Sequence, residues 1–246
     1  MTDVIANLNP FEKYQRMLGE KYLFRRVRLI CRALSNEIAS LVRSRQKMAN
    51  GKGDDRTILG LALQDEEYGS QATLNELVDQ MKTFLFAGHD TTASMLSWAY
   101  YYLSYHPHCH AKIKAEHDEV FGPDTDPATV GQKMNSTPSI LGKLEYTSAV
   151  LKESQRLRPI GDGARYAPPG YIIRTATGAE FDTTGTILNV QHEGLQTREE
   201  IWGPTAAEFD PERFMLGNTI PYAYMPFATR PRDCIGRNLA YLEVSS

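Results

Sequence analysis

The chain lacks the features that would place it in several large classes of protein. It has only 3 cysteines among 246 residues, too few and too scattered for a disulfide framework, which indicates a reducing compartment. It has no uninterrupted apolar run of about 18 residues, so no membrane span is expected. Its first residues lack the basic stretch and apolar run of a signal peptide.

An excess of charge of either sign is also missing. The formal net charge is −3, with 41% hydrophobic and 23% charged residues, so the composition predicts a soluble, globular protein. This balance gives no indication of a polyanionic partner, and no nucleic acid is expected to bind. The length suits one large domain or two small ones.

Helical patterns cover most of the chain. Apolar residues at helical spacing predict a helix over residues 11–48, followed by a polar, glycine-containing linker at 49–55. Thr73 and Glu76 have the spacing of a capping box, so a second long helix is expected over about 73–104. Further helices are predicted at about 108–120 and 144–157.

The pattern changes after Pro169 and Gly170. Residues 171–175 and 186–191 are typical of strands, and a turn with a short strand is expected between them. The segment that follows is rich in proline and glycine and has no regular period. The fold class is therefore expected to be mainly α with a small β-sheet near the C-terminal third.

A polar interruption lies inside the second long helix. In FLFAGHDTTASML, residues 84–96, Gly88 is less favourable in a helix than alanine by about 1 kcal/mol. Asp90, Thr91 and Thr92 favour hydrogen bonds between side chain and backbone. These residues predict a local widening or kink beside an acid and a hydroxyl. The alternative is a helix that ends at Gly88 and a new helix capped by Asp90.

One group of potential metal ligands, HPHCH at residues 106–110, is rejected as a site. Its thiol and imidazoles would suit zinc or copper. However, alternate residues at the start of a helix point in different directions, and no matching second half follows in the sequence. No metal site is expected there.

Cys234 lies in PFATRPRDCIGRNLA, residues 226–240, at the predicted N-terminus of a helix. The free N–H groups of such a helix end favour a thiolate. Gly236 leaves room for a flat group near the backbone, and Arg232 is a donor suited to a carboxylate. A thiolate, a flat ligand and a carboxylate partner together indicate haem. The alternative is a buried, inert cysteine.

Four motifs, in one order, resemble those of the cytochrome P-450 superfamily, the haem-thiolate monooxygenases. They are the cysteine loop Phe-x-x-Gly-x-Arg-x-Cys-x-Gly, the long-helix pattern Ala/Gly-Gly-x-Asp/Glu-Thr-Thr/Ser, Glu-x-x-Arg, and Pro-Glu-Arg-Phe. The matching residues are Phe227, Arg232, Cys234 and Gly236 in the first, Ala87, Gly88, Asp90, Thr91 and Thr92 in the second, Glu153 and Arg156 in the third, and residues 211–214 in the fourth.

The resemblance covers nearly the whole chain but only the C-terminal, haem-binding half of the family's fold, and it is similar in style to fungal members. It implies a single partial domain over residues 1–246. Within this domain, the oxygen-activating helix would be residues 73–104, the Glu-x-x-Arg helix residues 144–157, and the cysteine haem loop residues 227–236.

The resemblance also implies a haem cofactor (heme b) and a role for each matching residue. Cys234 would be the axial thiolate ligand and only metal ligand, and Asp90 and Thr91 would relay protons to bound oxygen. The remaining implied roles are haem contacts for Phe227, Arg232, Gly236 and Arg165, a buried charge triad of Glu153, Arg156 and Arg213, and a substrate lining of Phe84 and Ala87.

The activity that the resemblance implies is insertion of one oxygen atom from O₂ into a small apolar organic substrate, in secondary-metabolite biosynthesis. Electrons would come from an NADPH-dependent reductase. One alternative is a truncated, non-catalytic fragment that at most binds haem. Another is haem-thiolate isomerase or dehydratase chemistry, against which the Asp90–Thr91 pair argues. A cytoplasmic-side location is expected: full-length relatives are often anchored to the endoplasmic reticulum, and no anchor is present here.

Arg230 departs from the family's pattern, which has glycine at this position of the cysteine loop. That glycine permits a positive φ, which costs another residue on the order of 1–2 kcal/mol. Pro231 restricts Arg230 further. We therefore expect a strained or displaced loop and reduced affinity for haem.

Overall fold

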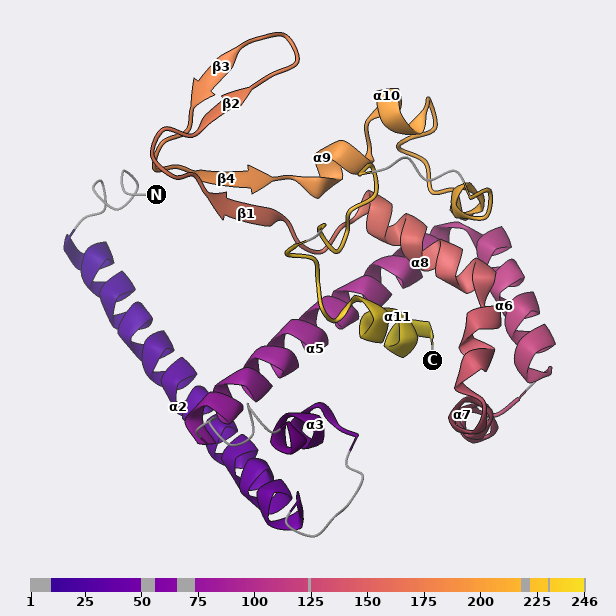
Figure 1. The fold of residues 1–246 in the computed structure, drawn as a ribbon, viewed down its shortest axis with the longest axis horizontal. Coiled ribbons are helices and arrows are strands. Elements are labelled where there is room, and N and C mark those ends of the chain that lie inside the picture. The colour runs from indigo at the N-terminus through magenta and orange to yellow at the C-terminus, as the bar shows by residue number, and fades with distance from the viewer. Residues whose placement is uncertain are drawn as a thin grey trace. The chain divides into compact units, whose positions relative to one another are not determined.

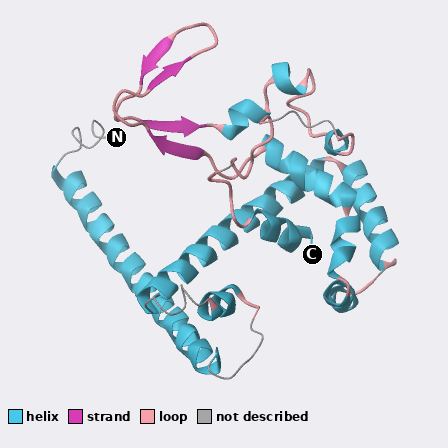
Figure 2. Ribbon diagram, viewed as in Figure 1, coloured by secondary structure: helices cyan, strands magenta, loops and turns pink. Residues whose placement is uncertain are grey.

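The computed structural model describes residues 10–49, 56–65, 74–123, 125–217, 222–229 and 231–245. These residues are mainly helical, and their strands form two antiparallel sheets of two strands each (Figure 2). The expected fold class is thereby confirmed. The chain divides into two compact units, Met1–Ala87 and Gly88–Ser246.

The first unit consists of helices that pack through a small apolar cluster. Ile38 and Val42 are buried against Leu77 and Val78. The expected helix at 11–48 is confirmed, whereas the short helix that follows the linker was not predicted. The elements are α2 (Pro10–Ala49), α3 (Ile58–Gln64) and the first part of α5 (Leu74–Tyr105).

Helix α5 runs through Gly88 without interruption (Figure 1). All residues from Leu74 to Tyr105 are described and are α-helical, so the expected widening is not formed and the alternative of a helix that ends at Gly88 is wrong. Beyond Gly88, Met95 and Ala99 are buried in the second unit. Their packing stabilises the helix more than one glycine weakens it. Thr73, the expected first cap, lies outside the described residues.

The second unit is organised around α8, whose residues are mostly buried. Helix α6 lies beside α8 (Figure 1), and both contribute to a cluster that includes Cys109, Tyr146 and Phe209. The helices expected at 108–120 and 144–157 are confirmed. The helical elements of this unit after α5 are α6 (Pro107–Phe121), α7 (Pro127–Ser136), η1 (Pro138–Lys143), α8 (Glu145–Leu157), α9 (His192–Gln196), α10 (Glu199–Trp202), η2 (Pro211–Phe214) and α11 (Arg237–Ser245).

The first turn of α8 is capped by a side chain from α6. Glu116 Oε1 accepts a hydrogen bond from the backbone N of Tyr146 at 2.6 Å, and Glu116 Oε2 accepts one from the backbone N of Thr147 at 2.9 Å. The N-cap residue Leu144 has no side-chain acceptor. Glu116 therefore satisfies helix-end N–H groups that the local sequence leaves without a partner.

The strands form two antiparallel pairs. Strand β1 (Gly163–Tyr166) pairs with β4 (Ile187–Val190), with Gly163 opposite Val190, and β2 (Ile172–Arg174) pairs with β3 (Glu180–Asp182). Strands β2, β3 and β4 fall where the sequence predicts them. Strand β1 was missed because its four residues, GARY, have no apolar alternation.

Candidate functional site

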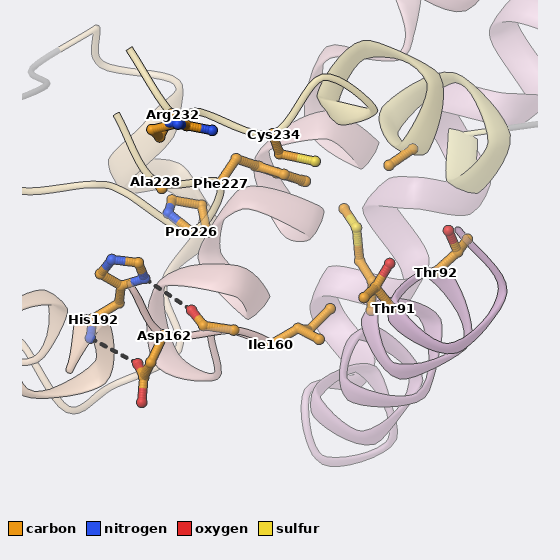
Figure 3. A pocket seen from close by; sticks show the side chains of 13 residues that line it. Thr91, Thr92, Ile160, Asp162, His192, Pro226, Phe227, Ala228, Arg232 and Cys234 are labelled. Carbon is orange, nitrogen blue, oxygen red and sulfur yellow. Dashed lines mark hydrogen bonds between the residues drawn. The ribbon is translucent and has the colours of Figure 1, made fainter. Parts of the chain in front are cut away.

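A cavity of about 240 Å³ lies in the second unit (Figure 3). Helix α5 contributes Thr91, Thr92 and Met95 to its wall, and the loop after α8 contributes residues 160–162. The segment that leads into α11 contributes Cys234. The cavity therefore brings together two regions that the motifs had selected, although they are far apart in the sequence.

Cys234 is an exposed, free thiol in the wall of this cavity. Its backbone N donates a hydrogen bond to the carbonyl oxygen of Phe227 at 2.9 Å, which closes the loop between them. Helix α11 begins at Arg237, so the sulfur stands just before a helix N-terminus. A Cβ on Gly236 would lie 3.8 Å from Cys234 Sγ, an ordinary contact, so an alanine would fit there.

An apolar cluster packs against the first residue of the cysteine loop. Phe227 and Tyr241 pack against buried Met95 and Leu151, and the rings of Phe227 and Tyr241 are 5.3 Å apart. The hydroxyls of Tyr224 and Tyr241 are 3.0 Å apart. Burial raises the pKa of both tyrosines, so both phenols stay neutral. The cluster therefore holds Phe227, the first residue of the cysteine loop, in place.

The backbone strain expected at Arg230 cannot be located there, because Arg230 lies outside the described residues. Two positions earlier, Ala228 has a φ of 58° and lines the cavity. A residue with a Cβ is unfavourable in this left-handed region. Part of the cysteine loop is therefore strained at an alanine.

Glu153 and Arg156 form a fully buried ion pair on α8. Arg156 donates from Nε and from Nη2 to the two carboxylate oxygens of Glu153, each at 2.7 Å. Its Nη1 donates to the carbonyl oxygens of Gln196 and Ala206, both at 2.7 Å. A buried charge pair needs such complete hydrogen bonding to offset the loss of hydration.

Arg213 joins this pair from η2. Its Nε lies 3.5 Å from Glu153 Oε1, and its Nη2 donates to the carbonyl oxygen of Thr205 at 3.1 Å. The guanidinium carbons of Arg156 and Arg213 lie 5.0 and 6.0 Å from the centre of the Trp202 ring. The structure thus brings together the three residues of the expected triad.

Gln196, which the sequence did not single out, connects the triad to the cysteine loop. Its side chain is fully buried, and Nε2 donates to the carbonyl oxygens of Gln155 and Arg156 at 3.1 and 3.0 Å. Its Oε1 accepts a hydrogen bond from the backbone N of Met225 at 2.7 Å. The side-chain amide of Gln196 therefore connects the end of α8 to the segment before Phe227. Nothing in the local sequence distinguishes this glutamine from a surface one.

Several expected site residues are not among those that line the cavity. Asp90 is exposed on α5, whereas its neighbour Thr91 lines the cavity. Arg165 is exposed on β1, and its Nη1 donates to the carbonyl oxygen of Ala164 at 2.7 Å. Phe84 is half-buried and Ala87 exposed, and both belong to the first unit. Arg232, another expected site residue, lines the cavity.

Comparison with known proteins identifies the family. The profile of the family described as Cytochrome P450 matches residues 2–246, and the chain belongs to the cytochrome P-450 family. Members of this family are haem-thiolate monooxygenases that hold the haem iron through a cysteine thiolate. Among the helices that the structure describes, none is long and apolar enough to cross a bilayer.

The relatives come from fungi and animals. Cytochrome P-450 monooxygenase acrF of Aspergillus aculeatus is 33% identical over 97% of this chain and 51% of its own length. Human cytochrome P-450 4V2 is 33% identical over 79% of this chain and 36% of its own length. The self-sufficient cytochrome P-450 monooxygenase CYP505E5 of Aspergillus niger is 31% identical over 98% of this chain and 22% of its own length. The chain spans about half the length of the relatives, or less.

Proposed function

We propose that this chain is the haem-binding half of a haem-thiolate monooxygenase, with residues 1–246 as one partial domain of the family. The reaction is insertion of one oxygen atom from O₂ into a small apolar organic substrate. The observation that carries the proposal is that the Cys234 thiol and the Thr91 hydroxyl line one largely apolar cavity. The fungal relative acrF is itself named a monooxygenase, which supports this reaction, and the role that we propose for this chain is in secondary-metabolite biosynthesis.

The residues of the cavity suit haem by their chemistry. A free thiol is the ligand that a haem-thiolate iron requires, and an arginine suits a propionate. Met95, Ile160 and Phe227 provide apolar walls for a porphyrin. In this proposal Cys234 Sγ holds the iron, Arg232 holds a propionate, and Phe227 and Gly236 contact the haem beside the sulfur. The bound haem supplies the activation of O₂.

Thr91 and Asp90 supply protons to the cavity. Asp90 is exposed, so its carboxylate can take a proton from solvent. The next residue, Thr91, lines the cavity, and its Oγ1 can accept a proton on one side while it donates one on the other. The pair therefore connects solvent to a site from which bulk water is partly excluded.

The charge triad acts by positioning rather than by chemistry. Glu153, Arg156 and Arg213 hold η2 against α8 through their ion pairs. Gln196 holds the backbone of Met225 by accepting a hydrogen bond from its N–H. The cysteine loop, residues 227–236, starts two residues after Met225. The triad and the glutamine amide thus determine where Cys234 lies.

The electron donor in this proposal is a separate NADPH-dependent reductase on the cytoplasmic side. This reductase would supply electrons to the haem in each turnover, because thiolate-bound iron needs external electrons to activate O₂. The self-sufficient relative shows that redox arrangements differ within the family.

The proposal is tested by the spectrum of the chain with haem. The 246-residue chain should bind iron protoporphyrin IX and give the red-shifted ferrous carbon monoxide band of a thiolate-ligated haem. Cys234→Ser should lose this band, while Cys31→Ser, a change at another exposed cysteine, should keep it. The same spectrum for the wild type and Cys234→Ser would overturn the proposal.

Turnover separates the proposed activity from its alternatives. With a reductase, NADPH and O₂, Thr91→Ala should consume NADPH with a smaller yield of oxygenated product. A haem-thiolate isomerase would be insensitive to this change. A chain that binds haem but consumes no NADPH with substrate and reductase would be the non-catalytic fragment.

A further inference from the structure

His192 lies in the wall of the cavity and has none of the roles described so far. It is the first residue of α9, and 4% of its surface is exposed. In Figure 3, His192 and Arg232 are on the same side of the cavity, opposite Thr91 and Thr92. A nearly buried imidazole therefore accompanies the arginine at one side of the site.

Two hydrogen bonds fix the position of His192. Its backbone N donates to Asp162 Oδ1 at 3.1 Å, and its Nδ1 is 2.9 Å from the carbonyl oxygen of Gly161. Because a carbonyl oxygen can only accept, Nδ1 must carry a proton. The second ring nitrogen, Nε2, has no hydrogen-bond partner among the residues that the structure describes.

This nitrogen is accessible to a ligand. Nε2 is not one of the fully buried, partnerless side-chain atoms of the described residues, so it is open to the cavity, where a ligand can bond to it. With the proton of Nδ1 held by Gly161, Nε2 donates a hydrogen bond only when the ring is an imidazolium. An anionic ligand compensates that positive charge. Arg232 adds a permanently charged donor on the same side.

We propose that His192 Nε2 and Arg232 together bind a propionate carboxylate of the haem. This inference rests on the proposed function, because it takes the haem as the occupant of the cavity. His192 is a further contact beside Arg165, to which the sequence also assigned a haem contact and whose guanidinium is exposed and donates to Ala164. Asp162 Oδ1 accepts from the backbone N of His192, and this carboxylate also lines the cavity, so the propionate binds against its negative charge.

The test compares two porphyrins that differ only at the carboxylates. The 246-residue chain is titrated with iron(III) protoporphyrin IX and with its dimethyl ester, and binding is followed by Soret absorbance and by quenching of tryptophan fluorescence. The wild type should prefer the free acid. His192→Phe should lower affinity for the free acid about tenfold and leave affinity for the ester unchanged. His192→Gln, whose amide still donates, should retain part of the preference for the acid.

Three results would overturn this inference. Equal affinity of the wild type for the acid and the ester would do so alone, and so would equal losses for both porphyrins in a folded His192→Phe variant. If His192→Phe loses its helical circular dichroism, the folded His192→Gln variant is used in its place. Equal losses of affinity for the acid and the ester in His192→Gln would also exclude a contact between His192 and the propionate. A wild type that binds neither porphyrin would instead overturn the proposed function, and this inference with it.

Discussion

Ala228 is the described residue of the cysteine loop whose backbone conformation is least favourable for its side chain. Its φ of 58° suits glycine, which has no Cβ to collide with the backbone. Ala228→Gly should therefore raise the free energy of unfolding by about 1 kcal/mol. Urea denaturation measures this. Thr229→Gly is the control, since its φ is not positive and glycine there should lower stability. A less stable Ala228→Gly would show that the loop is not strained at this residue.

The buried pair of Glu153 and Arg156 should be among the most sensitive positions of the chain. Arg156→Met removes both hydrogen bonds that Arg156 donates to the buried Glu153 carboxylate and leaves it with Arg213 Nε at 3.5 Å, so we expect a loss of about 3–5 kcal/mol of unfolding free energy. The double variant Glu153→Leu/Arg156→Met should lose less, because no buried carboxylate remains and only Arg213, which is partly exposed, loses its ion-pair partner.

Arg174 offers a matched control for the pair. Its ion pair with Glu180 has the same kind of groups at 2.6 Å but is exposed, so Arg174→Met should change stability by less than about 1 kcal/mol. Equal effects of Arg156→Met and Arg174→Met in denaturant titrations would contradict the importance of burial.

At the scale of elements, α8 depends on α6 for its N-terminal cap. Glu116→Ala removes the acceptors for two backbone N–H groups, and the loss of such a cap is expected to reduce stability by about 1–2 kcal/mol. Glu119→Ala, on the same helix but exposed, should have little effect. Hydrogen exchange at the amides of Tyr146 and Thr147 should accelerate only in the first variant. Unchanged protection there would show that water replaces the cap.

The elements that the sequence predicts best are long and periodic. Helices α2, α5, α6 and α8 follow from apolar spacing over many residues, and packing carries α5 through Gly88. Helix α3 was missed because it is short, and α7 because its ten residues contain none that is buried. Strand β1 forms only through its pairing with β4, more than twenty residues later in the chain.

The residues of the candidate site also fall into those that a local pattern predicts and those that depend on long-range contacts. Motif spacing selected Cys234, Arg232 and Thr91, and all three line the cavity. It also selected Arg165, which is exposed on β1 and is not among the lining residues, and it did not single out His192 and Gln196. Those two residues act through hydrogen bonds to segments about 30 and 40 residues away. No local pattern encodes such contacts, because they depend on how the meandering segment returns to α8.

At the scale of the whole molecule, the three cysteines differ in environment and should differ in reactivity. Cys31 and Cys234 are exposed, whereas Cys109 is fully buried and burial raises the pKa of its thiol. A thiol reagent should label two sites quickly in the native chain and the third only after denaturation.

Haem should change this labelling pattern. Iron protoporphyrin IX should protect one of the two fast sites in the wild type, and protection should be absent in Cys234→Ser. Mass spectrometry of labelled peptides identifies the protected site. Protection of Cys31 in place of Cys234 would contradict the assignment of the iron ligand.

The three hydrogen bonds of the Gln196 side chain all end on backbone atoms: two carbonyl oxygens and one N–H. Side chains at Gln155 and Met225 can therefore vary during evolution without breaking this connection, and the restriction on divergence falls on position 196 alone. A glutamate there would have the same length but no N–H to donate, and an asparagine would be one methylene too short. Selection at position 196 thus preserves the hydrogen bonds that connect the end of α8, where the ion pair lies, to the segment before the cysteine loop.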